Sequence, residues 1–204
     1  AQALRDVPRS AVDLEHPRFQ RLALIDSIGV ELCVLIDFSG EFSKLPGRHF
    51  LSMLSESGGL RFLAVGSDFR CGHRLDTGAD DIRAFCVERS VEVELLKAVQ
   101  WSGRPVSSSR IRKAILEGRM EDAAGMLGRP YEIDLRDARL TATGGFAPSG
   151  AQASPPAGVY EAYPAHEGAA NTVARLGADG SWTFAGPPGR DRVGLRLIRM
   201  VSKE

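Results

Sequence analysis

Apolar residues recur at intervals of three or four in five stretches of the chain, so that each stretch has one apolar face. This spacing predicts five helices, over about 17–27, 50–57, 80–89, 111–117 and 120–127. Gly118 and Gly128 directly follow the last two stretches, where a glycine readily ends a helix. The last two helices are therefore predicted to form a pair joined by a short turn.

Three shorter apolar runs between these stretches predict strands. Glu31–Phe38 contains the continuous run Leu-Cys-Val-Leu-Ile, which is typical of a strand buried on both faces. Arg61–Gly66 predicts a second buried strand, and Val91–Val99 alternates enough for a third. The resulting order, in which single helices and strands alternate before the helical pair, favours a three-layer α/β sandwich with a parallel sheet.

The composition changes after the helical pair. Thr141–Gly158 is rich in Gly, Ala, Ser and Pro, and strand-like runs then alternate with turn signals at 178–180 and 186–189 up to the run Val193–Val201. This pattern is typical of a small β-domain or abbreviated barrel. The predicted division is an α/β domain followed by a β-domain, over 1–131 and 132–204.

Length and charge restrict the possible functions. A chain of 204 residues, 43% of them hydrophobic, can fill one large core or two small ones. Its 26 Lys and Arg balance 26 Asp and Glu, so bulk charge attracts neither nucleic acid nor an anionic membrane. No apolar run reaches the roughly 20 residues of a membrane span, and the three cysteines, which lack metal-ligand spacing, suit a reducing compartment. We expect a cytoplasmic protein without a metal-ligand cluster, and the sequence carries no signal for its oligomeric state.

The run 106–112, Val-Ser-Ser-Ser-Arg-Ile-Arg, places three hydroxyls and two guanidinium groups at the start of a predicted helix. A serine at the N-cap binds backbone N–H groups, and the free N–H groups with the positive end of the helix dipole attract phosphate. An arginine one turn later can hold phosphate oxygens by charge-assisted hydrogen bonds. The alternative is an ordinary capped helix with a solvated basic face.

A second polar segment follows the predicted strand 61–66. Gly66 allows a tight turn and a close approach of a ligand, and Asp68 and Arg70 would lie at the carboxyl edge of the sheet. His73 could reach a phosphate or remain an exposed loop histidine, and Cys71 is expected to be a small buried thiol. A solvated acidic run, rather than a metal site, is expected of Asp76, Asp80 and Asp81.

Three ordered motifs, 65–72, 107–112 and 127–131, resemble the nucleotidyltransferase domain of bacterial FAD synthetase, the bifunctional riboflavin kinase and FMN adenylyltransferase. They read Val-Gly-Ser-Asp-Phe-Arg-Cys-Gly, Ser-Ser-Ser-Arg-Ile-Arg and Leu-Gly-Arg-Pro-Tyr. The serine-rich motif alone also fits adenylyltransferases of other phosphorylated cofactor precursors. The resemblance implies a Rossmann-like nucleotidyltransferase domain, with three α/β/α layers, and a small C-terminal β-domain.

The same resemblance implies a reaction, in which AMP passes from ATP to FMN to give FAD and pyrophosphate, and small-molecule substrates rather than a macromolecular partner. Mg²⁺ would bridge the phosphates. ATP phosphates would be bound by Ser107, Ser108, Ser109 and Arg112, of which Ser108 and Arg112 would act in catalysis. The part of the substrate site that receives the flavin and the nucleotide would be shaped by Gly66, Asp68, Phe69, Arg70 and Gly72.

Two motifs of the family do not occur in the 204 residues. The first is Gly-x-Phe-Asp-Gly-x-His-x-Gly-His, which supplies two imidazoles. We expect it to precede Ala1, because a parallel sheet without an inner strand would expose apolar surface and unpaired edges. The alternative is its loss, which would leave a non-catalytic flavin- or nucleotide-binding module. The second is the Pro-Thr-Ala-Asn motif of the riboflavin kinase barrel, so no kinase activity is expected from 132–204.

Overall fold

The structure, a computed structural model, describes residues 18–36, 38, 40–135, 138–149, 152–165, 170–184 and 194–203. These residues divide into two compact units. One unit comprises 34–99, and the other comprises 18–33 together with 100–203. The domain boundary expected near residue 131 stays a prediction.

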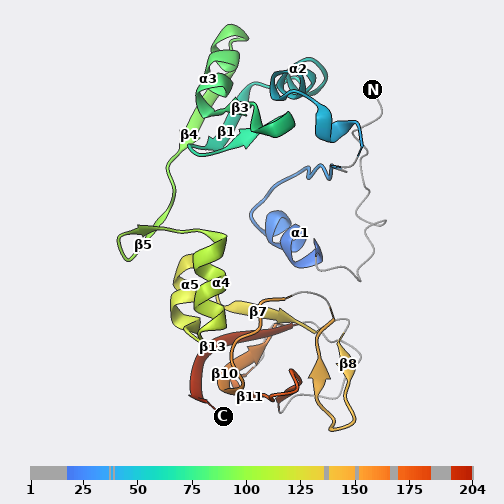
Figure 1. The fold of residues 1–204 in the computed structure, drawn as a ribbon, viewed down its shortest axis with the longest axis vertical. Coiled ribbons are helices and arrows are strands. Elements are labelled where there is room, and N and C mark those ends of the chain that lie inside the picture. Colours follow the sequence, from blue (N-terminus) through green and yellow to red (C-terminus); the bar gives the residue numbers. More distant parts are fainter. Residues whose placement is uncertain are drawn as a thin grey trace. The chain divides into compact units, whose positions relative to one another are not determined.

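The unit of 34–99 is built on two parallel strands (Figure 1). Its elements are η1 (Phe42–Lys44), α2 (Gly47–Gly58), β1 (Phe62–Gly66), β2 (Arg70–Cys71), η2 (His73–Leu75), β3 (Thr77–Gly78), α3 (Ala79–Glu88) and β4 (Glu92–Leu96). β1 pairs with β4, and β2 pairs with β3. The sequence-predicted helices over 50–57 and 80–89 are confirmed as α2 and α3, and the strands predicted over 61–66 and 91–99 as β1 and β4.

One apolar core holds this unit together. Leu51 of α2 and the α3 residues Ile82 and Phe85 are nearly inaccessible to solvent. They pack with Leu63 and Val65, which alternate along β1 and therefore share one face of the sheet. α2 and α3 consequently fix the position of β1 and of the turn that follows it.

The strand predicted over Glu31–Phe38 is wrong for the described part of that segment. Residues 31–36 and 38 lie outside helices and strands, and Leu32 is 64% exposed and Val34 40%. The run has the composition of a buried strand, but a strand forms only where a neighbour takes up its N–H and C=O groups. Among the described strands β1 pairs with β4 alone, so the expected three-layer sandwich stays a prediction.

The second unit joins helices to a curled antiparallel sheet of seven strands, in the order β7-β13-β10-β11-β12-β9-β8 (Figure 1). Its helices are α1 (Arg18–Ser27), α4 (Ser108–Leu116) and α5 (Met120–Leu127). The sheet comprises β7 (Tyr131–Asp134), β8 (Arg139–Leu140), β9 (Phe146–Ala147), β10 (Gly158–Pro164), β11 (Thr172–Leu176), β12 (Trp182–Phe184) and β13 (Gly194–Lys203). A separate hairpin consists of β5 (Gln100–Trp101) and β6 (Arg104–Pro105).

Several local predictions are confirmed in this unit. α4 and α5 form the expected helical pair, and the glycines that follow them, Gly118 and Gly128, have φ angles of 76° and 69°. The turn predicted at 178–180 connects β11 to β12, where the Gly180 N–H donates to the Gly177 carbonyl at 2.9 Å. The turn predicted at 186–189 lies outside the described residues.

The helical pair and the sheet share one hydrophobic core. Ile115 of α4 and Met120 of α5 cluster with Tyr160, Trp182 and Leu197 of the sheet, and each of these side chains is at most 2% exposed. The Tyr160 and Trp182 rings lie 5.5 Å apart, centroid to centroid. Burial raises the pKa of Tyr160 to about 12. The sheet therefore supports the helix that carries the serine-rich motif.

No described helix is long and apolar enough to cross a membrane.

Candidate functional site

A pocket of about 340 Å³ lies between the turn after β1 and the start of α3. It is lined by Ser67, Asp68, Phe69, Arg70, Gly78, Ala79, Asp80 and Asp81. The Ser67 N–H donates to the Leu96 carbonyl at 2.8 Å, and the Phe69 N–H donates to the Gly66 carbonyl at 3.0 Å. These bonds turn the chain back where β1 and β4 end, so the loop lies at the carboxyl edge of the two strands.

Three of the predicted loop residues, Asp68, Phe69 and Arg70, line this pocket. The Phe69 ring is 42% exposed and offers an apolar surface. The exposed Arg70 guanidinium has neither a hydrogen-bond nor an ion-pair partner among the residues that the structure describes. The pocket therefore combines an aromatic surface and one guanidinium with free donors, beside three carboxylates that also line it.

Sequence reasoning missed the other wall of the pocket, the first residues of α3. There the Asp81 carboxylate accepts the N–H of Gly78 at 2.9 Å and so caps the helix. The signal that could have found this wall is an acidic residue three positions after a glycine at a predicted helix start.

Gly72 has a structural reason to be glycine. Its φ is +83°, and an added Cβ would lie 2.1 Å from Asp76 Oδ1 and 2.2 Å from the Gly47 nitrogen. Asp76 in turn accepts the Gly47 N–H at 3.0 Å and the Thr77 hydroxyl at 2.9 Å, which caps the start of α2. Neither Gly72 nor Gly66 lines the pocket, and each instead sets the path of the loop beside it.

The expected solvated acidic run requires a correction. It holds for Asp80, whose side chain is 97% exposed. Asp76 and Asp81, although exposed, each bind a backbone N–H at a helix start. The physical reason is that the first N–H groups of a helix need acceptors, and a nearby carboxylate is a favourable one.

Cys71 and His73 have local partners in this unit. Cys71 is half-buried rather than buried as expected, because it lies against the edge of the core of this unit. Burial, with a further contribution from the Asp76 carboxylate, raises the pKa of the Cys71 thiol. His73 Nδ1 lies 3.2 Å from the Ser43 carbonyl oxygen, and the His73 backbone N–H donates to the Leu45 carbonyl at 2.9 Å. His73, the first residue of η2, therefore packs against η1 and the residue that follows η1.

The serine-rich start of α4 is capped as the sequence predicts. Ser107 has an extended backbone (φ −148°, ψ 155°), and its hydroxyl accepts the Arg110 N–H at 3.3 Å. Ser108 and Ser109 are exposed, and their hydroxyls have no hydrogen-bond partner within the described part of the chain. Because the first N–H groups of a helix also lack intrahelical acceptors, several donors are available here to one anion.

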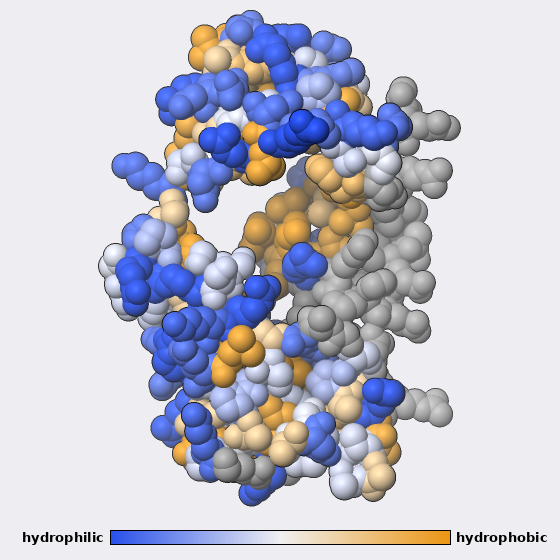
Figure 2. Space-filling model, viewed as in Figure 1, coloured by the Kyte–Doolittle hydropathy of each residue, from blue (hydrophilic) through white to orange (hydrophobic). Residues whose placement is uncertain are grey.

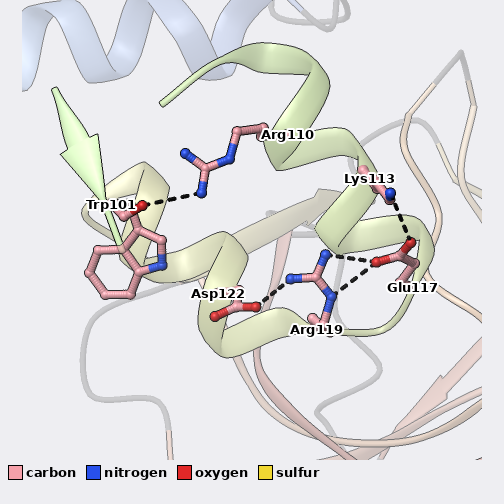
Figure 3. A network of polar contacts seen from close by, with 6 residues as sticks. All are labelled: Trp101, Arg110, Lys113, Glu117, Arg119 and Asp122. Carbon is pink, nitrogen blue, oxygen red and sulfur yellow. Dashed lines mark hydrogen bonds and ion pairs between the residues drawn. The ribbon is translucent and has the colours of Figure 1, made fainter. Parts of the chain in front are cut away.

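The two arginines of this motif have different surroundings. Arg110 donates through its guanidinium to the backbone carbonyl of Trp101 at 3.2 Å (Figure 3). It also donates to the backbone carbonyls of Arg104, at 2.7 Å, and Pro105. The Arg112 side chain is exposed and has no ion pair or hydrogen bond with any residue of the described ranges. Arg112 is therefore the cation of the motif whose donors are free.

The neighbouring charges on this helical pair are already paired. Arg119 binds Glu117 at 2.7 Å and also binds Asp122, and Lys113 lies 3.8 Å from Glu117 (Figure 3). The hydrogen bond between Glu117 and Arg119 lowers the pKa of Glu117 and raises the pKa of Arg119. Hydrophilic residues predominate over α4 and α5 on the face drawn in Figure 2. Of the cations on this surface, Arg112 is the one suited to an incoming anion.

The predicted site residues thus form two groups. The loop of Gly66–Gly72 belongs to the unit of 34–99, and Ser107–Arg112 belongs to the unit that contains the curled sheet. No cluster of three or more His, Cys, Asp or Glu side chains that could hold a metal ion occurs among the described residues.

Curated relatives of this chain carry names from flavin metabolism. It is 28% identical over 149 residues to the bifunctional riboflavin kinase/FMN adenylyltransferase of Escherichia coli strain K12, an alignment that covers 69% of this chain and 48% of that protein. It is 24% identical over 117 residues to a FAD synthetase of Listeria monocytogenes, which covers 57% and 48%. The chain spans less than half the length of these relatives.

A solved structure supports the fold. A crystal structure of a macrolide-efflux protein from Streptococcus pneumoniae superposes with a TM-score of 0.75 and 20% sequence identity, covering 93% of this chain and 66% of that one. At this identity the likeness concerns the fold alone. The family model for FAD synthetase matches residues 6–110, which is just over half of the chain. The match includes the whole motif at 65–72 and the first four residues of the motif at 107–112. The chain belongs to the FAD synthetase family.

Proposed function

We propose that this chain binds ATP and FMN for the transfer of AMP to FMN, which forms FAD and pyrophosphate. The observation that carries the proposal is the start of α4, where the free hydroxyls of Ser108 and Ser109 adjoin Arg112, a cation without a partner among the described residues. A helix N-terminus with free donors binds phosphate groups. An unpaired arginine can add charge-assisted hydrogen bonds without giving up an existing ion pair.

The reaction needs positioning of the two substrates more than covalent catalysis by the protein. A phosphate oxygen of FMN attacks the α-phosphorus of ATP, a new P–O bond forms, and the bond to the bridging oxygen breaks as pyrophosphate leaves. In-line alignment and neutralisation of the phosphate charge lower the barrier. In this proposal Ser107, Ser108 and Ser109 hold the phosphates, and Arg112 stabilises the charge on the leaving group.

In this proposal, the loop after β1 forms the part of the site that binds the flavin ring of FMN. The half-exposed Phe69 ring offers a flat apolar surface to a flavin, and the Arg70 guanidinium can pair with a phosphate. Mg²⁺ prefers oxygen ligands and is usually held by one or two carboxylates together with substrate phosphates. Asp68 in the same pocket fits that donor set, and the ion would neutralise phosphate charge.

We expect the 204-residue chain to bind ATP weakly and to bind FMN, yet to make no measurable FAD from the two. The binding groups on α4 and in the pocket are present, whereas the two imidazoles of the His-x-Gly-His motif do not occur in this sequence. Thermal unfolding with each ligand, followed by chromatography of the reaction mixture, measures both parts. The Escherichia coli relative serves as the active control.

The outcomes separate the alternatives. Thermal protection by FMN and ATP, but not by pantetheine phosphate, supports the proposal. Protection by pantetheine phosphate in place of FMN would indicate an adenylyltransferase for another cofactor precursor. FAD formation at the rate of the control would contradict the requirement for the two histidines.

A second expected result is that the chain does not phosphorylate riboflavin. Residues 132–204 lack the Pro-Thr-Ala-Asn motif, and the interior of the curled sheet is filled by Tyr160, Trp182 and Leu197. Incubation with riboflavin and Mg-ATP, analysed for FMN by chromatography beside the Escherichia coli relative, measures this activity. Several turnovers of FMN per protein molecule would contradict it.

A further inference from the structure

The hairpin that precedes the serine-rich motif is attached to α4 by Arg110. Between β5 and β6, Ser102 and Gly103 have φ angles of 49° and 71°, as a two-residue turn requires. Arg110 donates to the carbonyls of Trp101, Arg104 and Pro105, which come from both strands of the hairpin. One side chain thus attaches both strands of the hairpin to the first turn of the helix. Figure 3 shows the contact with Trp101.

The hairpin has a second attachment, to α5. A Cβ built on Gly125 would lie 2.2 Å from the indole ring of Trp101, so the ring packs directly on the backbone of α5 at that glycine. The hairpin is consequently held to both helices of the pair, through a polar contact at α4 and an apolar contact at α5.

These contacts determine how the chain enters α4. Pro105 lies two residues before the N-cap Ser107, so holding the Pro105 carbonyl fixes the direction of the segment that places the serines. Residues two apart on a helix lie about 200° apart around its axis. Arg110 can therefore contact the hairpin while Arg112 stays exposed to solvent. Because its acceptors are uncharged carbonyls, these contacts do not offset the positive charge of the guanidinium beside the helix start.

We infer that Arg110 is a positioning residue for the phosphate-binding start of α4, acting through the hairpin Gln100–Pro105 and not by contact with the substrate. This inference rests on the proposed function for its ligand. The attachment itself can be tested independently of any ligand.

The experiment labels the protein with 5-fluorotryptophan, which gives one ¹⁹F resonance for Trp101 and one for the buried Trp182. Arg110→Gln is expected to shift the Trp101 resonance toward that of solvent-exposed fluorotryptophan and to weaken ATP binding about tenfold. It should also speed amide exchange at Ile111, whose N–H donates to the Ser107 carbonyl at 3.0 Å. The Trp182 resonance should not move. The matched variant Arg112→Gln should weaken ATP binding and leave the Trp101 resonance unchanged.

A second variant keeps both arginines. Gly125→Ala favours α5 by helix propensity but places a methyl group where the indole packs. It should therefore reproduce the Trp101 shift and the faster Ile111 exchange while the Trp182 resonance stays unchanged.

An unchanged Trp101 resonance in Arg110→Gln would overturn the inference, as would a shifted resonance with unchanged amide exchange at Ile111. If the unmodified chain does not bind ATP, the proposed function fails, and Arg110 is then judged on the ¹⁹F and amide-exchange results alone. Arg110→Lys, which retains one cationic donor, should give an intermediate Trp101 shift.

Discussion

Replacing Arg112 with alanine is expected to weaken ATP binding to the start of α4 by about 10- to 100-fold, the loss produced by removing hydrogen bonds to a charged group. Arg112 is exposed and makes no ion pair with a described residue. Its removal therefore leaves no buried group without a partner, and the melting temperature should stay the same. Titration of ATP, followed through the amide resonances of Ser108 and Ser109, measures the affinity.

The adjacent Lys113 provides the matched control. Lys113→Ala removes the same charge from the same helix, but Lys113 already lies 3.8 Å from Glu117. Because the Glu117 carboxylate already offsets part of the Lys113 charge, this variant should change the affinity less than about twofold. Equal losses in the two variants would indicate attraction by net charge alone, and would remove Arg112 from the specific binding of phosphate.

Replacing Trp182 with alanine is expected to lower the free energy of unfolding by about 3–5 kcal/mol, as large-to-small changes of a buried aromatic residue do. Trp182 is 1% exposed and contacts Tyr160 at a ring distance of 5.5 Å. Because single domains have only about 5–15 kcal/mol of stability, this loss is a large fraction of the total. Urea unfolding followed by circular dichroism measures it.

The same variant tests whether the helical pair and the sheet unfold together. Ile115 and Met120 belong to the cluster that contains Trp182, so amide protection in α4 and α5 should fall along with that of the sheet. Val173→Ala is the control, since Val173 lies on β11 and is 62% exposed, and it should change stability by at most about 0.5 kcal/mol. Helices that keep full protection while the sheet exchanges would contradict the shared core.

Elements governed by neighbouring residues could be predicted from the sequence. The start of α4 is one, because a cap is a bond between Ser107 and an N–H only three residues away. The ends at Gly118 and Gly128 are others, because the left-handed conformation that closes a helix depends on the residue itself. β1 and the turn after it could also be predicted from neighbouring residues. This turn places Asp68, Phe69 and Arg70 at the end of the strand.

The tertiary structure decided the features that depend on residues distant along the chain. The apolar run at 31–38 matches a buried strand, yet the described strands give it no pairing partner, and strand formation requires one. The second wall of the pocket comes from α3, which packing brings beside the loop after β1. Whether Arg110 or Arg112 is free for an anion depends on carbonyls in a hairpin up to nine residues away. Sequence periodicity reports which face of an element is apolar, but a contact depends on what that face or side chain meets after folding.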